Sequence, residues 1–338
     1  MLKVLIIGSN YFNFNNSVKE AFESLGWQTI VDGYDNPIHP FKGLIKWQHK
    51  FSFNKEKLRD QQAKKYNQYI LRIFSEINPD LVFILNGNIL FTKTLDMFRQ
   101  TSKVAVWMYD AISRFPKSQE HIDHSDAFFC YEKQDVEHYF QQGKIAYFLP
   151  QACDENLYYS IHTPKDIDIL FVGVLYRYEK RIKLLQEVVT RFSDKKILII
   201  GIYKPWYKNP LKYLFRERRD IYSNKNIPVK EVNKYYNCSK IVINIHHETQ
   251  KYGANPKVFE ISGAGAYQIC DANPYIESVF PNGEIGLYHN EEELFACIDD
   301  ALTNDKSTEI KKAQEIILTQ HTFLHRVKEM LQIIGELP

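Results

Sequence analysis

The sequence predicts an α/β protein built from two successive series of parallel strands and helices. Short continuous runs of Val, Ile, Leu and Phe, typical of strands buried on both faces, alternate with helical patterns. This alternation stops near residues 153–164 and then begins again. A length of 338 residues also favours two cores over one. We therefore expect two Rossmann-like domains at residues 1–153 and 154–315, and a closing C-terminal helix at 316–338.

The first series opens with the apolar run KVLIIG at residues 3–8, which predicts a buried strand. A helix follows near 17–25, and Gly26 is a plausible residue to end it. A long helical pattern occupies residues 55–77, and Pro79 terminates it. The remaining apolar runs predict strands at 28–33, 80–87, 103–110, 126–132 and 145–151.

The second series begins with DIDILFVGVL at residues 166–175 and continues with a helix at about 179–192. Strands are predicted at 195–203, 240–246 and 266–271. The final stretch, residues 308–334, has the amphipathic pattern of one or two helices. Alternating strands and helices favour parallel sheets with right-handed crossovers.

Composition excludes several classes of protein. Charged residues make up 25% of the chain and balance to a formal +2, which argues against a dedicated nucleic-acid binder. The five cysteines include no C-x-x-C pair, so we expect reduced, mostly buried thiols and no zinc site. The first apolar run is too short for a signal peptide or a membrane span. We expect a cytoplasmic protein, with contact to the inner face of a membrane left open.

The most specific segment is NPKVFEISGAG, which begins at residue 255. Asn255 is a good N-cap and Pro256 suits the first position of a helix, whose free amides would favour a phosphate. Lys257 and Glu260 share one helix face, where they form either a surface ion pair or part of a binding site. A buried carboxylate needs hydrogen-bond donors, and the two vicinal hydroxyls of a ribose would supply them.

Four segments in the second half together resemble one known group of enzymes. Residues 255–294, NPKVFEISGAGAYQICDANPYIESVFPNGEIGLYHNEEEL, resemble the donor-binding segment of the GT-B glycosyltransferases of the spore-maturation-protein B (CgeB) group, related to glycosyltransferase family four. Residues 169–185 resemble the opening strand and phosphate-contacting turn of the donor domain of that group. Residues 227–246 resemble the helix and strand before the donor site, and residues 321–331 resemble the closing helix.

The resemblance implies a GT-B fold, in which two Rossmann-like domains face each other across a cleft, and a nucleoside-diphosphate sugar as donor. It implies that Glu260 binds the ribose, and that Lys257, which replaces the usual arginine of the group, faces the diphosphate together with the helix start at Asn255. Arg177 would be a second cation that stabilises the departing diphosphate. Further donor-side candidates are Gly253, which would allow the turn before the helix, His246, and the small residues Gly263 and Ala264, which suit close approach by a ligand or a strand.

No metal or other cofactor is expected. His246 and His247 are adjacent on a strand and point to opposite faces, so they cannot easily chelate one ion. His121 and His124 have H-x-x-H spacing but lack a convincing third ligand. Resemblance to family four also implies a metal-independent reaction that retains the configuration at the anomeric carbon.

In the first half, Asp110 ends a predicted parallel strand, where ligands of open sheets gather. It is a candidate general base or acceptor-binding carboxylate, or else a helix N-cap. A retaining enzyme would not need it as a base, whereas an inverting enzyme would. Asn10, Asn86 and Asn88 also lie at strand ends and are candidate acceptor-binding amides or turn residues.

The acceptor is not specified by the sequence. A glycan or a lipid-linked glycan is the default expectation, and a modified-DNA acceptor stays open. The basic, aromatic segment at residues 203–220 is read as a solvated insertion, with contact to a membrane surface as the alternative. Two rival functions remain: a non-catalytic nucleotide-sugar or glycan-binding protein, and an NAD-dependent oxidoreductase or epimerase. The second is disfavoured because the first strand is followed by GSNYFN rather than G-x-G-x-x-G.

Overall fold

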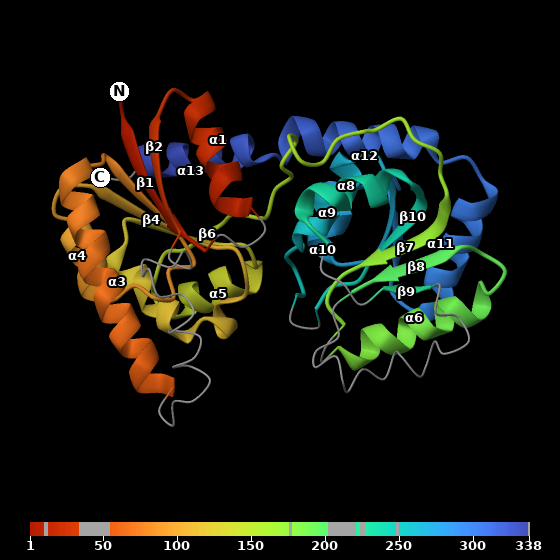
Figure 1. Ribbon diagram of the computed structural model, residues 1–338, viewed down its shortest axis with the longest axis horizontal. Coiled ribbons are helices and arrows are strands. Elements are labelled where there is room, and N and C mark those ends of the chain that lie inside the picture. Colours follow the sequence, from red (N-terminus) through yellow and green to blue (C-terminus); the bar gives the residue numbers. More distant parts are fainter. Residues whose placement is uncertain are drawn as a thin grey trace. The chain divides into compact units, whose positions relative to one another are not determined.

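The computed structural model describes residues 1–9, 13–33, 55–175, 178–201, 221–223, 227–247 and 250–336. The chain divides into two compact units (Figure 1). The first comprises Met1–Pro150 and Phe323–Pro338, and the second comprises Gln151–Thr322. The last helix thus belongs to the first unit, while the rest of the segment from residue 316 belongs to the second. Three predictions lie outside the described residues, namely Asn10, Arg177 and the segment 203–220.

The first unit contains a six-stranded sheet in the order β2-β1-β3-β4-β5-β6. Each neighbouring pair is parallel, as the sequence predicts. The order reverses direction between β1 and β3, so the chain switches sides of the sheet there. The strands are β1 (Lys3–Gly8), β2 (Gln28–Gly33), β3 (Leu81–Leu85), β4 (Lys103–Met108), β5 (Ala127–Cys130) and β6 (Tyr147–Phe148).

Helices α1 (Phe14–Ser24), α3 (Lys55–Ile77), α4 (Thr92–Phe98), α5 (Lys133–Gln141) and α13 (Phe323–Glu336) and two 3₁₀ segments, η2 (Ile112–Arg114) and η3 (Pro116–His124), accompany this sheet. Gly26 follows α1 at φ 81°, which confirms its predicted role at the end of that helix. Helix α13 packs against α1 through Phe323, whose ring centroid is 5.8 Å from that of Phe14. Its Arg326 donates a 3.0 Å hydrogen bond to the carbonyl of Pro150.

The second unit contains a parallel six-stranded sheet in the order β12-β11-β10-β7-β8-β9. Here the reversal lies between β7 and β10. The strands are β7 (Ile167–Val172), β8 (Ile197–Ile200), β9 (Tyr222–Ser223), β10 (Ser239–Asn244), β11 (Tyr267–Asp271) and β12 (Gly286–Tyr288). The helices are α6 (Glu179–Arg191), α8 (Val229–Asn237), α9 (Pro256–Gly263), α10 (Pro274–Val279), α11 (Glu291–Thr303) and α12 (Ser307–Gln320).

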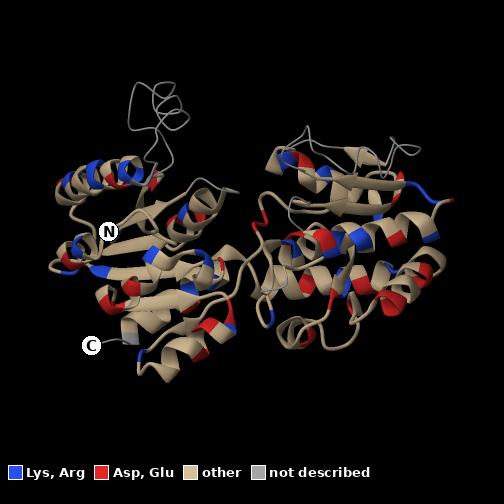
Figure 2. Cartoon of the chain, turned by 90° about the horizontal axis from the view of Figure 1, so that it is seen from below, with Lys and Arg blue, Asp and Glu red and all other residues tan. Residues whose placement is uncertain are grey.

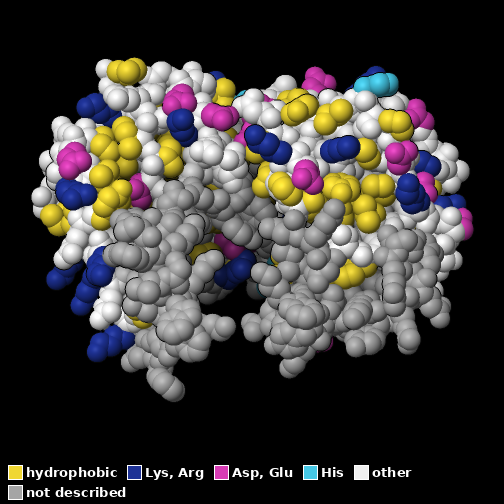
Figure 3. Space-filling view, viewed as in Figure 1, with side chains coloured by type: hydrophobic (Ala, Val, Ile, Leu, Met, Phe, Trp, Pro, Cys, Tyr) yellow, Lys and Arg dark blue, Asp and Glu magenta, His cyan; other side chains and the backbone are white. Residues whose placement is uncertain are grey.

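The strands form the cores of both units, and most charge lies on the helices (Figure 2). Every residue of β3 is buried, as expected of a strand covered on both faces. Basic and acidic side chains are interspersed over the described surface of the second unit in the view of Figure 3. Among the described residues, no helix is both long and apolar enough to cross a membrane.

The two histidines of the H-x-x-H pair have separate partners. His121 is fully buried, and its Nε2 lies 3.3 Å from the carbonyl oxygen of Leu90. His124 is partly exposed, and its Nδ1 lies 2.6 Å from Asp96 Oδ1. Burial lowers the pKa of His121 to about 4, so its imidazole is neutral in the folded protein.

Acidification is therefore expected to destabilise the protein through His121. Its pKa is lower in the folded state than in the unfolded state, so it contributes stability above about pH 6.5 that is lost as the pH falls towards 4. Between pH 7 and pH 5 the expected loss is about 2 kcal/mol. Urea unfolding at both pH values measures it. His121→Gln can still donate to Leu90 but does not titrate, so an equal loss in this variant would contradict the assignment.

Candidate functional site

The candidate site lies at the carboxyl ends of β7 and β10, where the strand order of the second sheet reverses. Ligands of open parallel sheets bind at such switch points. The side chain of Arg181, in the first turn of α6, joins the two strand ends. Its guanidinium donates hydrogen bonds of 2.6 Å to the carbonyl of Val174 and of 2.7 Å to the carbonyl of Ile245.

Arg181 carries a half-buried positive charge. Burial lowers the pKa of its guanidinium, and its Nε atom has no hydrogen-bond partner among the described residues. The guanidinium carbon lies 4.5 Å from the centre of the Tyr178 ring, so a cation–π contact stabilises part of the charge. Within the described part of the chain, no carboxylate lies close enough to form an ion pair with it.

Lys257 supplies a second cation beside Arg181. Burial lowers the pKa of Lys257, the charge of Glu260 raises it, and the charge of Arg181 lowers it again. The side chain makes no hydrogen bond or ion pair with any described residue. Glu260 and Asp271 lie near these two cations without forming a close ion pair with either of them, so an anionic ligand could still bind both.

Helix α9 begins at Asn255, as predicted, but the side chain of Asn255 does not cap it. Asn255 and Asn244 instead exchange two buried hydrogen bonds, of 2.9 and 3.1 Å between their amide groups. Asn244 also donates to Gln268, which in turn donates to the carbonyl of Val258. This buried network fixes α9 on the sheet and leaves the first-turn amide of Lys257 without an intrahelical acceptor.

Glu260 is buried one turn after the helix start and does not form a surface ion pair. Burial raises the pKa of its carboxyl, while Lys257 and the hydroxyl groups of Tyr158 and Tyr236 lower it. The Tyr236 hydroxyl interacts with this carboxylate outside the geometry of a regular hydrogen bond. Two aromatic hydroxyls therefore accompany a carboxylate that has further lone pairs for a ligand.

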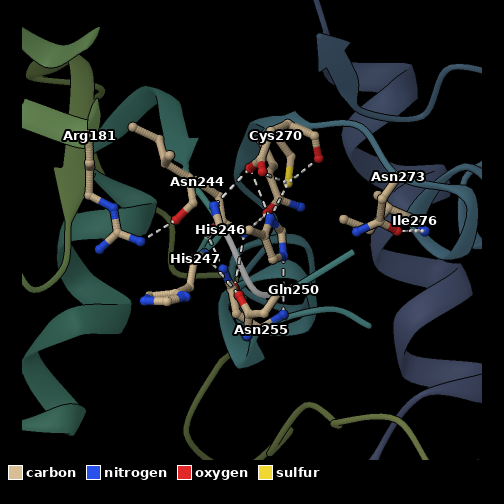
Figure 4. Close-up of polar contacts among 12 residues, drawn as sticks. Arg181, Asn244, His246, His247, Gln250, Asn255, Cys270, Asn273 and Ile276 are labelled. Carbon is tan, nitrogen blue, oxygen red and sulfur yellow. Dashed lines mark hydrogen bonds and ion pairs between the residues drawn. The ribbon is translucent and has the colours of Figure 1, made fainter. Parts of the chain in front are cut away.

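His246 follows β10 and is held from both sides (Figure 4). Its Nδ1 lies 2.9 Å from Asp271 Oδ1, and its Nε2 accepts a 3.1 Å hydrogen bond from the backbone N–H of Asn255. Cys270 Sγ lies 3.6 Å from the same Nδ1. Burial disfavours ionisation of Asp271, but its contacts with His246 outweigh this effect and hold the pKa of the carboxyl below its usual range.

His246, Cys270 and Asp271 place three potential ligand atoms within 4.8 Å of one another, so a metal site must be considered. The hydrogen bonds argue against it. Because the N–H of Asn255 points at Nε2, the proton of the neutral ring must be on Nδ1. Nδ1 then has no lone pair for an ion. Burial also raises the pKa of the Cys270 thiol well above its usual value, which disfavours the thiolate that a metal would bind.

The other residues predicted to bind the donor make contacts within the chain that explain their presence without a ligand. Gly253 does not have a positive φ, and its carbonyl accepts a 3.0 Å hydrogen bond from Asn273. Gly263 and Ala264 lie at the far end of α9 from Lys257. A Cβ atom at Gly263 would lie 2.4 Å from Cys153 Sγ, so the absence of a side chain there allows packing within the chain.

In the first unit, Asp110 follows β4 and is partly exposed. Its carboxylate forms an ion pair with Arg114 and accepts a 2.9 Å hydrogen bond from Ala111, but it does not cap η2. Asn86 is fully buried and its Oδ1 accepts from the backbone N–H of Tyr109, so it supports the loop after β4 rather than facing solvent. Asn88 is exposed.

Sequence reasoning missed Asp135 in the first turn of α5. Burial raises the pKa of Asp135 to about 6, and its carboxylate accepts a 3.0 Å hydrogen bond from the backbone N–H of Ile112. Sequence reasoning also missed Asp271, Tyr158 and Tyr236. Asp271 could have been found, because it ends the strand predicted at 266–271, and ligands of open sheets gather at the carboxyl ends of strands.

The sequence and the fold of this chain are similar to those of known glycosyltransferases. Residues 180–332 match a protein-family model described as "Glycosyl transferase-like". No curated protein matches the sequence. The solved structures that match include sucrose-phosphate synthase from Thermosynechococcus elongatus, with 12% identity, a TM-score of 0.69 and coverage of 99% of each chain.

A second similar structure is Anabaena Alr3699/HepE in complex with UDP and glucose, with 11% identity, a TM-score of 0.65 and coverage of 100% of each chain. A third is described as a "putative UDP-N-acetylglucosamine 2-epimerase from Listeria monocytogenes", with 14% identity, a TM-score of 0.61 and coverage of 99% of this chain and 96% of that one. The predicted GT-B fold class, with two parallel-sheet units, is thereby confirmed. The third structure also shows that the fold alone does not decide the reaction.

Proposed function

We propose that this protein is a glycosyltransferase that moves a sugar from a nucleoside-diphosphate sugar to a glycan or lipid-linked acceptor. The observation that carries the proposal is the pair of half-buried cations beside the start of α9, Arg181 and Lys257. The charges of Asp271 and Glu260 act on them, but neither cation forms a close ion pair with a described residue. A diphosphate would supply that close anionic partner. The family match over residues 180–332 and the Anabaena complex with UDP support a nucleotide-sugar donor.

Each group has a distinct task in the proposed reaction. Glu260 accepts hydrogen bonds from the two ribose hydroxyls. Lys257, Arg181 and the first-turn amide of α9 face the diphosphate, where negative charge grows as the bond to the sugar breaks. Fixed cations in a buried site stabilise that charge without reorganising, so they lower the barrier. We propose a metal-independent reaction that retains the anomeric configuration and takes place in the cytoplasm.

Thermal-shift measurements with UDP, GDP, ADP, their sugar conjugates and NAD test the proposal. We expect at least one nucleoside diphosphate and its sugar conjugate to stabilise the protein. Stabilisation by NAD alone would overturn the proposal in favour of an oxidoreductase. Hydrolysis of the bound sugar donor, followed by release of the nucleoside diphosphate, then separates an enzyme from a non-catalytic binding protein.

Asp110→Asn is expected to change donor turnover by less than about tenfold, because a retaining reaction without a protein base does not need this carboxylate. Loss of a general base would instead slow turnover by about 10²–10⁴-fold. Release of nucleoside diphosphate from the donor measures the rate. Asp135→Asn is the matched variant, since Asn can still accept from Ile112. A large loss in either variant would identify that carboxylate as a base and contradict the retaining mechanism.

A further inference from the structure

The two hydrogen bonds of the His246 ring determine which of its nitrogens carries the proton. The ring has one nitrogen that must donate and one that must accept. Its Nε2 accepts from the backbone N–H of Asn255, the residue that begins α9, at 3.1 Å. Its Nδ1 can then only donate, and the acceptor is Asp271 Oδ1 at 2.9 Å. The same carboxylate oxygen also accepts from the backbone N–H of His246 at 2.9 Å.

We infer that His246 is a positioning residue: locked by Asp271 in the tautomer with the proton on Nδ1, it holds the start of α9 where the donor diphosphate binds. This inference rests on the proposed function. Lys257 is only two residues beyond Asn255, so a shift of Asn255 would displace both its amide and its ammonium group. The imidazole thus acts on the donor through the helix and does not touch it.

The hydrogen bond from Asn255 to His246 requires a neutral imidazole ring. An imidazolium ring would place an N–H at Nε2 against the N–H of Asn255, and two donors cannot hydrogen-bond each other. The side chain of His246 is only 1% exposed, so water cannot easily replace the lost partner.

Several groups around the ring oppose or favour that protonation. Asp271 favours the imidazolium through its charge. Arg181 from α6 lies near enough to Asp271 to compete for that charge. Cys270 from β11 is a neutral thiol because burial raises its pKa, and the buried Tyr288 from β12, whose pKa is also raised, is a neutral phenol. The N–H of Asn255 is therefore the contact that disfavours the charged ring.

The first test is spectroscopic and needs no ligand. Long-range ¹H–¹⁵N correlation spectra of the ¹⁵N-histidine-labelled protein at pH 7.5 report which ring nitrogen carries the proton. We expect the Nδ1–H tautomer for His246, with the signal assigned by its absence from His246→Gln. A signal from the Nε2–H tautomer or from an imidazolium would overturn the inference.

The second test measures affinity for UDP, GDP and ADP by calorimetry in two variants. His246→Gln can place its carbonyl oxygen where Nε2 lies, so it should keep the affinity within about threefold. His246→Leu has no acceptor and should lose about tenfold more, the equivalent of one hydrogen bond. Equal losses in the two variants would contradict the inference.

If no nucleotide binds, the proposed function fails together with the donor role of His246, while the tautomer still decides whether His246 is held by Asp271 and Asn255.

Discussion

Glu260→Gln is expected to lower the affinity for the matching nucleoside diphosphate by about 100-fold. A carboxylate can accept from both ribose hydroxyls, whereas an amide offers one acceptor and one donor. One hydroxyl would then face an N–H₂ group in a buried site, and leaving such groups unpaired costs about 2–5 kcal/mol. Isothermal titration calorimetry with the nucleotide found by thermal shift measures the change.

The same variant should be more stable than the wild type without ligand. Burial raises the pKa of Glu260, so the ionised carboxylate costs folding free energy at neutral pH. Glutamine removes that cost. Because the pKa in the folded state lies above that in the unfolded state, the cost shrinks as the pH falls and Glu260 takes up a proton. The advantage of the variant should therefore be larger at pH 7.5 than at pH 5.

Glu284→Gln is the matched control for both measurements. Glu284 is another buried glutamate of the second unit, but hydrogen bonds from Asn282 outweigh the effect of burial and lower its pKa. Its glutamine variant should be less stable than the wild type and should keep its nucleotide affinity. If Glu260→Gln behaved in the same way, Glu260 would be a structural residue and the ribose assignment would be wrong.

Lys257→Met is expected to weaken binding of the nucleoside diphosphate by about 10–100-fold, because it removes one of the two half-buried cations proposed to face the phosphates. Binding of the corresponding nucleoside, which carries no phosphate, should change little. The affinity of the variant should also depend less on salt concentration. Calorimetry with both ligands at two ionic strengths separates these effects.

Lys251→Met controls for a general loss of positive charge, since Lys251 is exposed and precedes α9. It should leave the affinity unchanged. Lys257→Arg restores the residue that the resembling group carries and should keep most of the affinity, because the charge remains. An equal loss of nucleoside and nucleoside-diphosphate binding in Lys257→Met would show that the lysine supports the site only indirectly.

The fold could be predicted because its strands are continuous apolar runs. Burial on both faces leaves no polar alternation, and the run in residues 3–8 coincides with β1, in which every residue after Lys3 is buried. Short elements carry less signal. The seven residues of α4 and the three of β12 were not predicted, because few apolar positions fall within elements of that length.

The site was predictable in part. Asn255, Lys257 and Glu260 belong to the N-cap and first turns of one helix, so their relative positions could be predicted from their spacing in the sequence. The partners of these residues come from distant segments: Arg181 from α6, Tyr158 from the start of the second unit and Tyr236 from α8. Only the tertiary arrangement brings these groups to one place, and no spacing rule connects them.

The start of α9 was predicted correctly, but for a different physical reason from the one that the structure shows. The hydrogen bonds between the side chains of Asn255 and Asn244 explain the difference. Asparagine is favoured before a helix because its oxygen can accept from a first-turn amide. Here the side-chain oxygen of Asn255 accepts a hydrogen bond from Asn244 on β10. Asn255 therefore lies at the start of the helix, but its side chain binds to the sheet and does not cap the helix. A helix start that is left free of its own cap is better suited to a ligand.

The position of α13 has a consequence for biosynthesis. The hydrophobic contact of Phe323 with Phe14 and Trp107, and the hydrogen bond from Arg326 to Pro150, join segments that are separated in the order of synthesis by the whole second unit. The second unit is contiguous and can complete its core before α13 is made. The nascent first unit must wait for α13 with part of its apolar surface exposed, and chaperones would have the most time to bind it there.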